Sequence, residues 1–300
     1  MSPKQRAFLE LHCAVLLWGF TAILGQKIQL AAFVLVWWRL AITCGVIASF
    51  VNLRKTISAL PRDLIKKYFF VGCIVTAHWL LFYSAIKLAN ASVALICLST
   101  TSIMASIAEP LMTGKKIKLY ELSLGIIIIP AMIFIAGKLP SSMNLGIFIG
   151  LLSAVLVVFF SILNKKLVSE ADAMTITFLE LGGGLIMLTL LMPFYFMIDT
   201  SATFMPQSGI DWVYLVLLSV LCTNIAYWLG VRSLRQLSAF ATSLTVNLEP
   251  LYGIALAVIL LKENKQLPTS FYYGGGIIVF AVLLYPFLRS KFETVVGEEL

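Results

Sequence analysis

The sequence predicts an all-α integral membrane protein with ten transmembrane helices, arranged as an inverted repeat of five plus five. The first observation behind this prediction is composition: the 300 residues are 60% hydrophobic and 12% charged, with a mean hydropathy of +0.98. A soluble domain carries about 25% charged residues. The second is a series of long apolar stretches, and the third is the distribution of the basic residues between them. So much apolar surface requires lipid as its solvent.

The apolar stretches are long enough to cross a bilayer, which needs about 20 helical residues. They must be helices, because unpaired backbone groups are too costly in lipid. Leu119–Ala136 is short and contains Glu121 and Pro130. The ten predicted spans are Phe8–Gln26, Ala31–Val51, Tyr68–Ile86, Ala91–Thr113, Leu119–Ala136, Leu145–Leu163, Met174–Ile198, Asp211–Gly230, Ser238–Leu261 and Ser270–Leu288.

The basic residues between these spans predict their orientation. One set of termini and loops carries 16 Lys and Arg, the other set carries 5, and Arg39 lies inside a span. Basic loops stay in the cytoplasm, so we expect an inner (cytoplasmic) membrane protein with both termini in the cytoplasm. The same rule explains the net charge of +8, and no nucleic-acid partner is expected.

An odd number of spans in each half turns the second half upside down in the membrane. We therefore expect one five-helix repeat over residues 1–140 and an inverted one over 141–300. Loop spacing supports this, since Gly114–Leu119 and Lys262–Leu267 follow corresponding spans. Inverted repeats are a common architecture of alternating-access transporters.

Several short motifs then occur in a recognisable order: Trp18-Gly19, Trp38-Arg39, Ala91-Ser92-Val93-Ala94, Leu248-Glu249-Pro250-Leu251 and Lys262-Glu263-Asn264-Lys265. With them the chain resembles the drug/metabolite transporter superfamily, in particular its EamA-type permeases, over nearly its whole length. Gly114-Lys115 departs from the pattern, since the family often has Gly-Glu there. The resemblance implies ten helices in an inverted repeat, a central cavity lined mainly by spans 1, 3, 4, 6, 8 and 9, and substrates among amino acids, other small metabolites and drug-like cations.

Charged side chains within spans are the first candidates for a transport path, because each costs free energy to insert. Glu249 lies near the middle of span 9 before Pro250, which can bend a helix; Thr245, one turn earlier, shares its face. The carboxylate could bind a cation or a proton, or be a buried structural acid. Arg39 could bind a substrate carboxylate, pair with Glu180 or another acid, or snorkel outward. Glu180 is expected near the interface.

Aromatic and small polar residues complete the predicted substrate-binding set. Trp79 and Tyr83 share one face of span 3 with His78 beside it, an arrangement suited to an aromatic or cationic solute. Trp18 lies deeper in span 1 than the interface where Trp usually sits. Each could instead serve packing, as hydroxyl residues in spans often do. The predicted substrate-binding residues are Trp18, His78, Trp79, Tyr83, Ser99, Asn224, Trp228, Thr245 and Glu249.

These features predict a secondary transporter, with export of a small metabolite by alternating access around a midplane cavity. No GxxxxGK[ST] motif is present, so an ion or solute gradient would supply the energy. A facilitative exchanger or a nucleotide-sugar-type carrier is the alternative. A membrane-embedded enzyme is disfavoured, since the chain has two histidines and no clustered acid or metal motif. Five cysteines without a CxxC pair predict small buried apolar residues and neither a disulfide framework nor a metal site. No cofactor is expected. The expected partners are a small-molecule substrate and membrane lipid, with the chain as a monomer or homodimer.

Overall fold

The computed structural model describes residues 2–50, 58, 60–114, 119–167, 169–234, 237, 245–246 and 248–297. Helices account for almost all of the described chain, and it contains no strand. Parts of the predicted second and ninth spans lie outside these residues, as do Arg54, Lys55, Lys115, Lys116, Lys118 and Arg235 among the basic residues that predict the orientation. The helices are α1 (Pro3–Lys27), α2 (Ala32–Phe50), α4 (Arg62–Leu88), α5 (Ala91–Leu98), α6 (Thr101–Thr113), α7 (Leu119–Ala136), α8 (Asn144–Leu167), α9 (Ala173–Ile198), α10 (Gly209–Val216), α11 (Ala226–Leu234), α13 (Glu249–Leu256) and α14 (Thr269–Gly297).

Four short segments complete the secondary structure. Two are 3₁₀ turns, η1 (Ser141–Met143) and η4 (Glu263–Lys265), and two are π-helical, η2 (Leu217–Ile225) and η3 (Ala257–Leu261). η2 joins α10 to α11, and η3 extends α13. Within the described chain, six helical segments are long and apolar enough to cross a membrane, or seven if the bent pair α5 and α6 is one span. The six correspond to the predicted spans 1, 2, 3, 6, 7 and 8.

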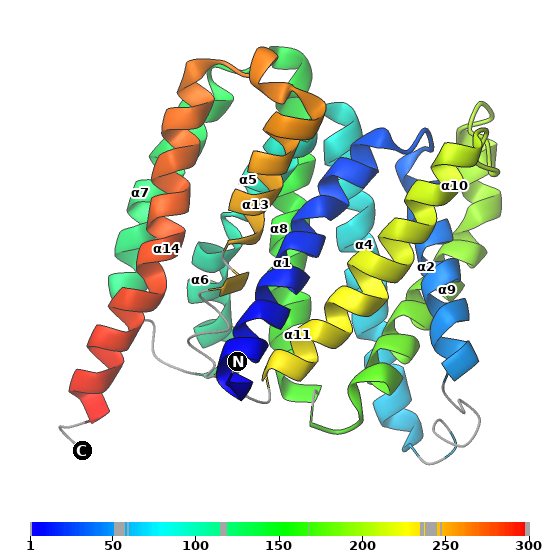
Figure 1. The fold of residues 1–300 in the computed structure, drawn as a ribbon, viewed down its shortest axis with the longest axis horizontal. Coiled ribbons are helices and arrows are strands. Elements are labelled where there is room, and N and C mark those ends of the chain that lie inside the picture. Colours follow the sequence, from blue (N-terminus) through cyan, green and yellow to red (C-terminus); the bar gives the residue numbers. More distant parts are fainter. Residues whose placement is uncertain are drawn as a thin grey trace.

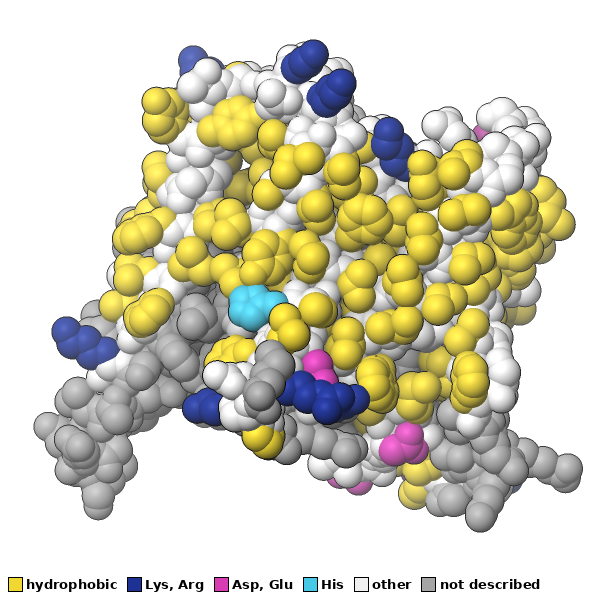
Figure 2. All heavy atoms as spheres, viewed as in Figure 1, with side chains coloured by type: hydrophobic (Ala, Val, Ile, Leu, Met, Phe, Trp, Pro, Cys, Tyr) yellow, Lys and Arg dark blue, Asp and Glu magenta, His cyan; other side chains and the backbone are white. Residues whose placement is uncertain are grey.

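The helices stand side by side in one bundle (Figure 1). α4 packs against α8 and α9 at its centre, α1 packs against α11 and α13, and α7 pairs with α14 at one edge. The start of α1 and the end of α14 lie at the same end of the bundle (Figure 1). The face in Figure 2 carries a broad band of hydrophobic side chains, with Lys and Arg above and below it. This distribution is typical of a membrane-embedded bundle.

Close contact between α4 and α9 depends on glycines. A Cβ added at Gly72 would lie 1.8 Å from the carbonyl oxygen of Glu180, and one at Gly184 would lie 1.8 Å from Thr76 Oγ1. Small residues allow such backbone approach in membrane bundles. The Gly182–Gly184 run therefore serves helix packing mainly through Gly183 and Gly184, because a Cβ at Gly182 meets nothing within 4 Å.

Two buried carboxylates tie the second half of the chain to the first at the end opposite the termini. Glu263 accepts hydrogen bonds from the backbone N–H groups of Ala91 (3.1 Å) and Ser92 (2.9 Å), which the start of α5 would otherwise leave unpaired. Asp211 accepts one from the N–H of Gln29 at 2.9 Å. Both are about 98% buried. Glu263 thereby holds η4 against the start of α5, and Asp211 holds α10 against the loop after α1.

Candidate functional site

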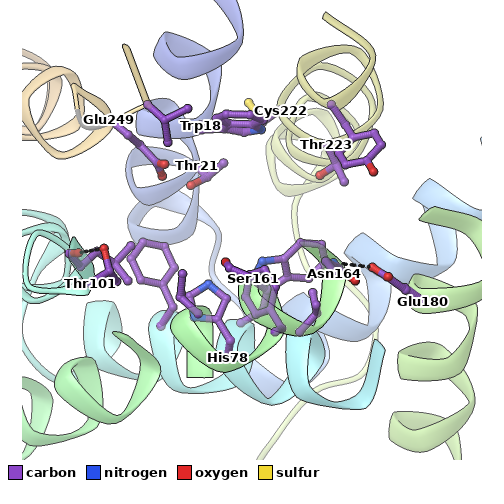
Figure 3. A pocket seen from close by; sticks show the side chains of 18 of the residues that line it. Trp18, Thr21, His78, Thr101, Ser161, Asn164, Glu180, Cys222, Thr223 and Glu249 are labelled. Atoms are coloured by element: carbon purple, nitrogen blue, oxygen red, sulfur yellow. Dashed lines mark hydrogen bonds between the residues drawn. The ribbon is translucent and has the colours of Figure 1, made fainter. Parts of the chain in front are cut away.

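A cavity of about 430 Å³ lies in the interior of the bundle (Figure 3). This size is within the range that small-molecule sites occupy. Its lining comes from both halves of the chain, from α1, α2, α4, α5 and α6 on one side and from α8, α9, η2, α11 and α13 on the other. Most of the lining surface is apolar, as it usually is in ligand sites. The polar lining residues are Thr21, Arg39, His78, Ser99, Thr101, Ser161, Asn164, Thr177, Glu180, Thr223, Tyr227 and Glu249.

The cavity brings together some of the residues predicted from sequence. It is lined by Trp18, Arg39, His78, Trp79, Ser99 and Glu249. Tyr83, Asn224, Trp228 and Thr245 are not among the lining residues that the structure describes. A part in substrate binding stays a prediction for all of them.

The four predicted residues that do not line the cavity lie close to it or on the surface of the bundle. Tyr83 is fully buried, and Thr245 is 3% exposed. Trp228 is 48% exposed, with the guanidinium of Arg232 4.9 Å from its ring centroid. Asn224 lies in η2, where neither atom of its buried amide has a hydrogen-bond partner in the described chain.

Arg39 is held by three groups that are all uncharged. Its Nε donates to Thr223 Oγ1 at 3.0 Å and its Nη1 donates to the Tyr83 hydroxyl at 2.8 Å. Its guanidinium carbon lies 3.7 Å from the ring centroid of Trp79, a cation–π contact. Pairing with Glu180 was one of the alternatives for Arg39, and among the described residues this ion pair is not formed. The cation that stacks on Trp79 in this structure is therefore part of the protein.

The π-helical segment η2 positions Thr223 for this contact. π-Helical turns are rare and often occur at functional sites. The Thr223 hydroxyl donates to the Leu218 carbonyl five residues earlier, at 2.9 Å, and accepts from Arg39. Thr223 and Cys222 both line the cavity. Hydropathy gives no signal for a change of helical pitch, and Thr223 was therefore not among the residues predicted from the sequence.

His78 is anchored to α8. Its Nδ1 lies 2.8 Å from Ser153 Oγ, and the same hydroxyl donates to the His78 carbonyl at 3.1 Å. The ring also packs near Phe82 and Phe160. These contacts leave the ring 7% exposed, so His78 joins α4 to α8 while forming part of the cavity wall.

The predicted span Ala91–Thr113 is broken rather than continuous. α5 ends at Leu98 and α6 begins at Thr101, with a bend of 42°. Hydroxyl side chains explain the break: Thr100 Oγ1 donates to the Cys97 carbonyl (2.6 Å) and Thr101 Oγ1 to the Leu98 carbonyl (2.8 Å). Such bonds compete with the regular helix and bend it. Ser99 and Thr101 thereby line the cavity at the break.

Glu249 occupies the start of α13. Residues 238–244 and 247 of the predicted span 9 lie outside the described part of the chain, so the expectation that Pro250 bends this span stays a prediction. α13 begins at Glu249, and Pro250 lies in its first turn, where no intrahelical partner awaits the missing N–H. Figure 3 shows the carboxylate reaching toward Thr21 of α1. Gly19 brings α1 close, since a Cβ there would lie 2.9 Å from the Gly253 nitrogen. The positive end of the α13 dipole favours a negative charge at this position.

Glu180 was expected near the interface, and this expectation was wrong: it is 6% exposed and lines the cavity. Its Oε2 accepts from Asn164 Nδ2 at 3.3 Å (Figure 3). Asn164 was not among the residues predicted from the sequence, since it lies one residue beyond the predicted end of span 6. A signal for it does exist in the sequence: Asn164 and Glu180 are both eight residues from Asp172, in the turn between α8 and α9, and a helical hairpin brings such positions together.

The cavity thus combines aromatic walls, two carboxylates, one engaged guanidinium and several hydroxyls. Such a set can hold a solute that carries a cationic or hydrogen-bonding group. Among the residues described, no group of three or more His, Cys, Asp or Glu side chains is placed to bind a metal ion.

Apolar spanning helices around an internal polar cavity define a multi-pass membrane protein of the transporter class. Comparison with known proteins identifies the kind of transporter. The chain belongs to the EamA-like transporter family, whose model matches residues 6–137 and again residues 144–286. This places it, as the sequence motifs indicated, among the drug/metabolite transporters.

Two individual proteins resemble the chain over nearly its full length. The uncharacterized transporter YxxF of Bacillus subtilis (strain 168) is 22% identical over 302 residues, which cover 97% of this chain and 93% of that protein. A solved protein crystal structure superposes with a TM-score of 0.64 at 14% identity, over 96% of this chain and 98% of the other. That likeness shows a shared fold.

Proposed function

We propose that this protein is a secondary transporter that exports a small metabolite by alternating access around the central cavity. The observation that carries the proposal is the cavity itself, whose polar lining comes from both halves of the chain. Arg39, His78 and Ser99 come from the first half, and Asn164, Glu180 and Glu249 from the second. A site between two halves can open alternately to either side when the halves rock against each other.

The proposed architecture is ten transmembrane helices in two inverted sets of five, residues 1–140 and 141–300, with both termini in the cytoplasm. The double match of the family model supports two repeats of similar length. The common position of both ends of the described bundle supports an even number of spans (Figure 1). Basic loops support the cytoplasmic side for the termini.

The proposed substrates are amino acids, related metabolites or drug-like cations. Glu249 would set charge selectivity, and Trp18 and Trp79 would contact the solute. The aromatic wall favours flat or cationic groups. Tyr83, Thr223 and Trp79 hold the Arg39 side chain in the cavity wall. From this fixed position its charge offsets part of the negative charge of the carboxylates.

The experiment is solute counterflow into proteoliposomes with a panel of radiolabelled amino acids, quaternary ammonium compounds and nucleotide sugars. We expect saturable exchange of an amino acid or a quaternary ammonium compound, and a large loss of that flux in Glu249→Gln at normal expression. Asp63→Asn is the matched acid-to-amide control, because Asp63 lies on the exposed start of α4. Unchanged flux in Glu249→Gln would assign Glu249 to structure. Exchange of nucleotide sugars alone would favour the carrier alternative.

A further inference from the structure

The Glu180–Asn164 pair leaves two hydrogen-bond acceptors without donors. Asn164 Nδ2 donates to Glu180 Oε2, while Glu180 Oε1 and Asn164 Oδ1 have almost no accessible surface and no partner in the described chain. Buried acceptors are normally satisfied in folded proteins, so each exception calls for a reason. Two such acceptors on one interacting pair indicate a missing hydrogen.

A proton on Glu180 supplies that hydrogen. With Glu180 ionised, the amide N–H donates to Oε2 and leaves Oε1 and Asn164 Oδ1 without a donor. With Glu180 protonated on Oε1, the carboxyl hydrogen is donated to Asn164 Oδ1 while the amide N–H continues to donate to Oε2, so one added hydrogen serves both acceptors. Asn164 can therefore partner both forms, since an amide offers a donor and an acceptor.

The geometry at Glu180 favours a proton over a larger ligand. Its Oε1 has almost no accessible surface, which leaves no room for an ammonium group beside it. The backbone is fixed as well, because Gly72 of α4 lies directly against the Glu180 carbonyl. Glu180 thus cannot move far to meet a solute, whereas a proton requires no added volume.

The charged and titratable groups around Glu180 include none that forms an ion pair with it among the described residues. Tyr68 of α4 and Tyr227 of α11 interact with it electrostatically. From α2, α4 and α13, Arg39, His78 and Glu249 share the cavity with it. The guanidinium of Arg39 is held by Thr223, Tyr83 and Trp79 instead.

We propose that Glu180 and Asn164 form a proton-binding site that couples transport to a proton gradient. This inference rests on the proposed transport function. Glu180 takes up one proton when the cavity opens to the acidic side and releases it when the cavity opens to the other. The solute moves in the opposite direction. Asn164 is the positioning residue that stabilises both protonation states.

The test is infrared difference spectroscopy of the purified full-length protein between acid and alkaline buffer, with protons as the only ligand. We expect a protonated-carboxyl band that is lost in Glu180→Gln and present in Asp63→Asn and Glu249→Gln. Glu180→Asp should restore a band. Asn164→Leu should shift its frequency, because the carboxyl hydrogen loses its acceptor.

An unchanged band in Glu180→Gln would overturn the proposal, and so would a band lost only in Glu249→Gln. If Glu180→Gln cannot be purified, Glu180→Asp and Asn164→Leu test the proposal in its place. A carboxyl band that is unaltered in both of these variants would also refute the proton site. The spectroscopy does not depend on transport. A normal Glu180 band with no flux of any panel solute would refute the transport function alone, whereas flux without this band would refute the proton site alone.

Discussion

Replacing Gly72 by alanine tests the contact that fixes Glu180 in the bundle. The new Cβ would lie 1.8 Å from the Glu180 carbonyl oxygen, 2.5 Å from its carbon and 2.7 Å from its Cα, all backbone atoms. Ordinary contact begins at 3.4 Å, so α4 and α9 must separate by 1.6 Å along the shortest of these directions. Overpacking of this kind costs about 1–3 kcal/mol. We expect a loss of about 2 kcal/mol in the free energy of unfolding.

The assay is unfolding of the purified protein in mixed micelles with increasing SDS, followed by tryptophan fluorescence. Gly182→Ala is the matched control, because a Cβ there meets nothing within 4 Å and alanine is the better helix former by about 1 kcal/mol. We expect the control to be as stable as the wild type or more so. Gly72→Ala as stable as Gly182→Ala would refute the close approach of α4 and α9.

Three further predictions follow from other contacts. Glu263→Ala leaves two buried N–H groups of α5 unpaired and should lower the free energy of unfolding by about 3 kcal/mol in the same assay. Glu263→Gln keeps an acceptor and should lower it by less. If both variants were as stable as the wild type, the hydrogen bonds from Glu263 to the start of α5 would be contradicted. Arg39→Lys loses the planar stacking on Trp79 and should lower the free energy of unfolding by about 1–2 kcal/mol. A variant that is as stable as the wild type but has altered flux would instead indicate that Arg39 binds the solute directly. Hydrogen bonds from Ser201 and Tyr195 lower the pKa of the Asp199 carboxyl. These bonds therefore form at neutral pH and are lost as the pH falls through the lowered pKa. A carbon-13 NMR titration of Asp199 should show a higher pKa in Ser201→Ala than in the wild type.

The membrane-spanning segments could be predicted because apolar length is a property of the local sequence. Six predicted spans have counterparts among the long apolar helices of the described chain. The break at Ser99–Thr101 could not be read from hydropathy, since the hydroxyl groups that cause it are compatible with a straight helix too. Hydropathy likewise gives no sign that α13 begins at Glu249.

The site was predicted in part because buried charges and mid-membrane aromatics are rare and stand out in a sequence. Their partners are set by packing between distant segments. Arg39 bonds to Tyr83 and Thr223, which are 44 and 184 residues away, and no local pattern pairs them. Glu180 was underrated because its depth was counted along one helix, whereas its 6% exposure depends on the packing of α9 against neighbouring helices.

Sided access to the cavity tests the central proposal most directly. Ser161 lines the cavity and is exposed within it, so Ser161→Cys, in a protein whose five native cysteines are replaced by alanine, offers a thiol to a membrane-impermeant reagent. We expect labelling when the reagent is added to either face of proteoliposomes of uniform orientation, and protection by a transported solute. Labelling confined to one face under every condition would contradict alternating access.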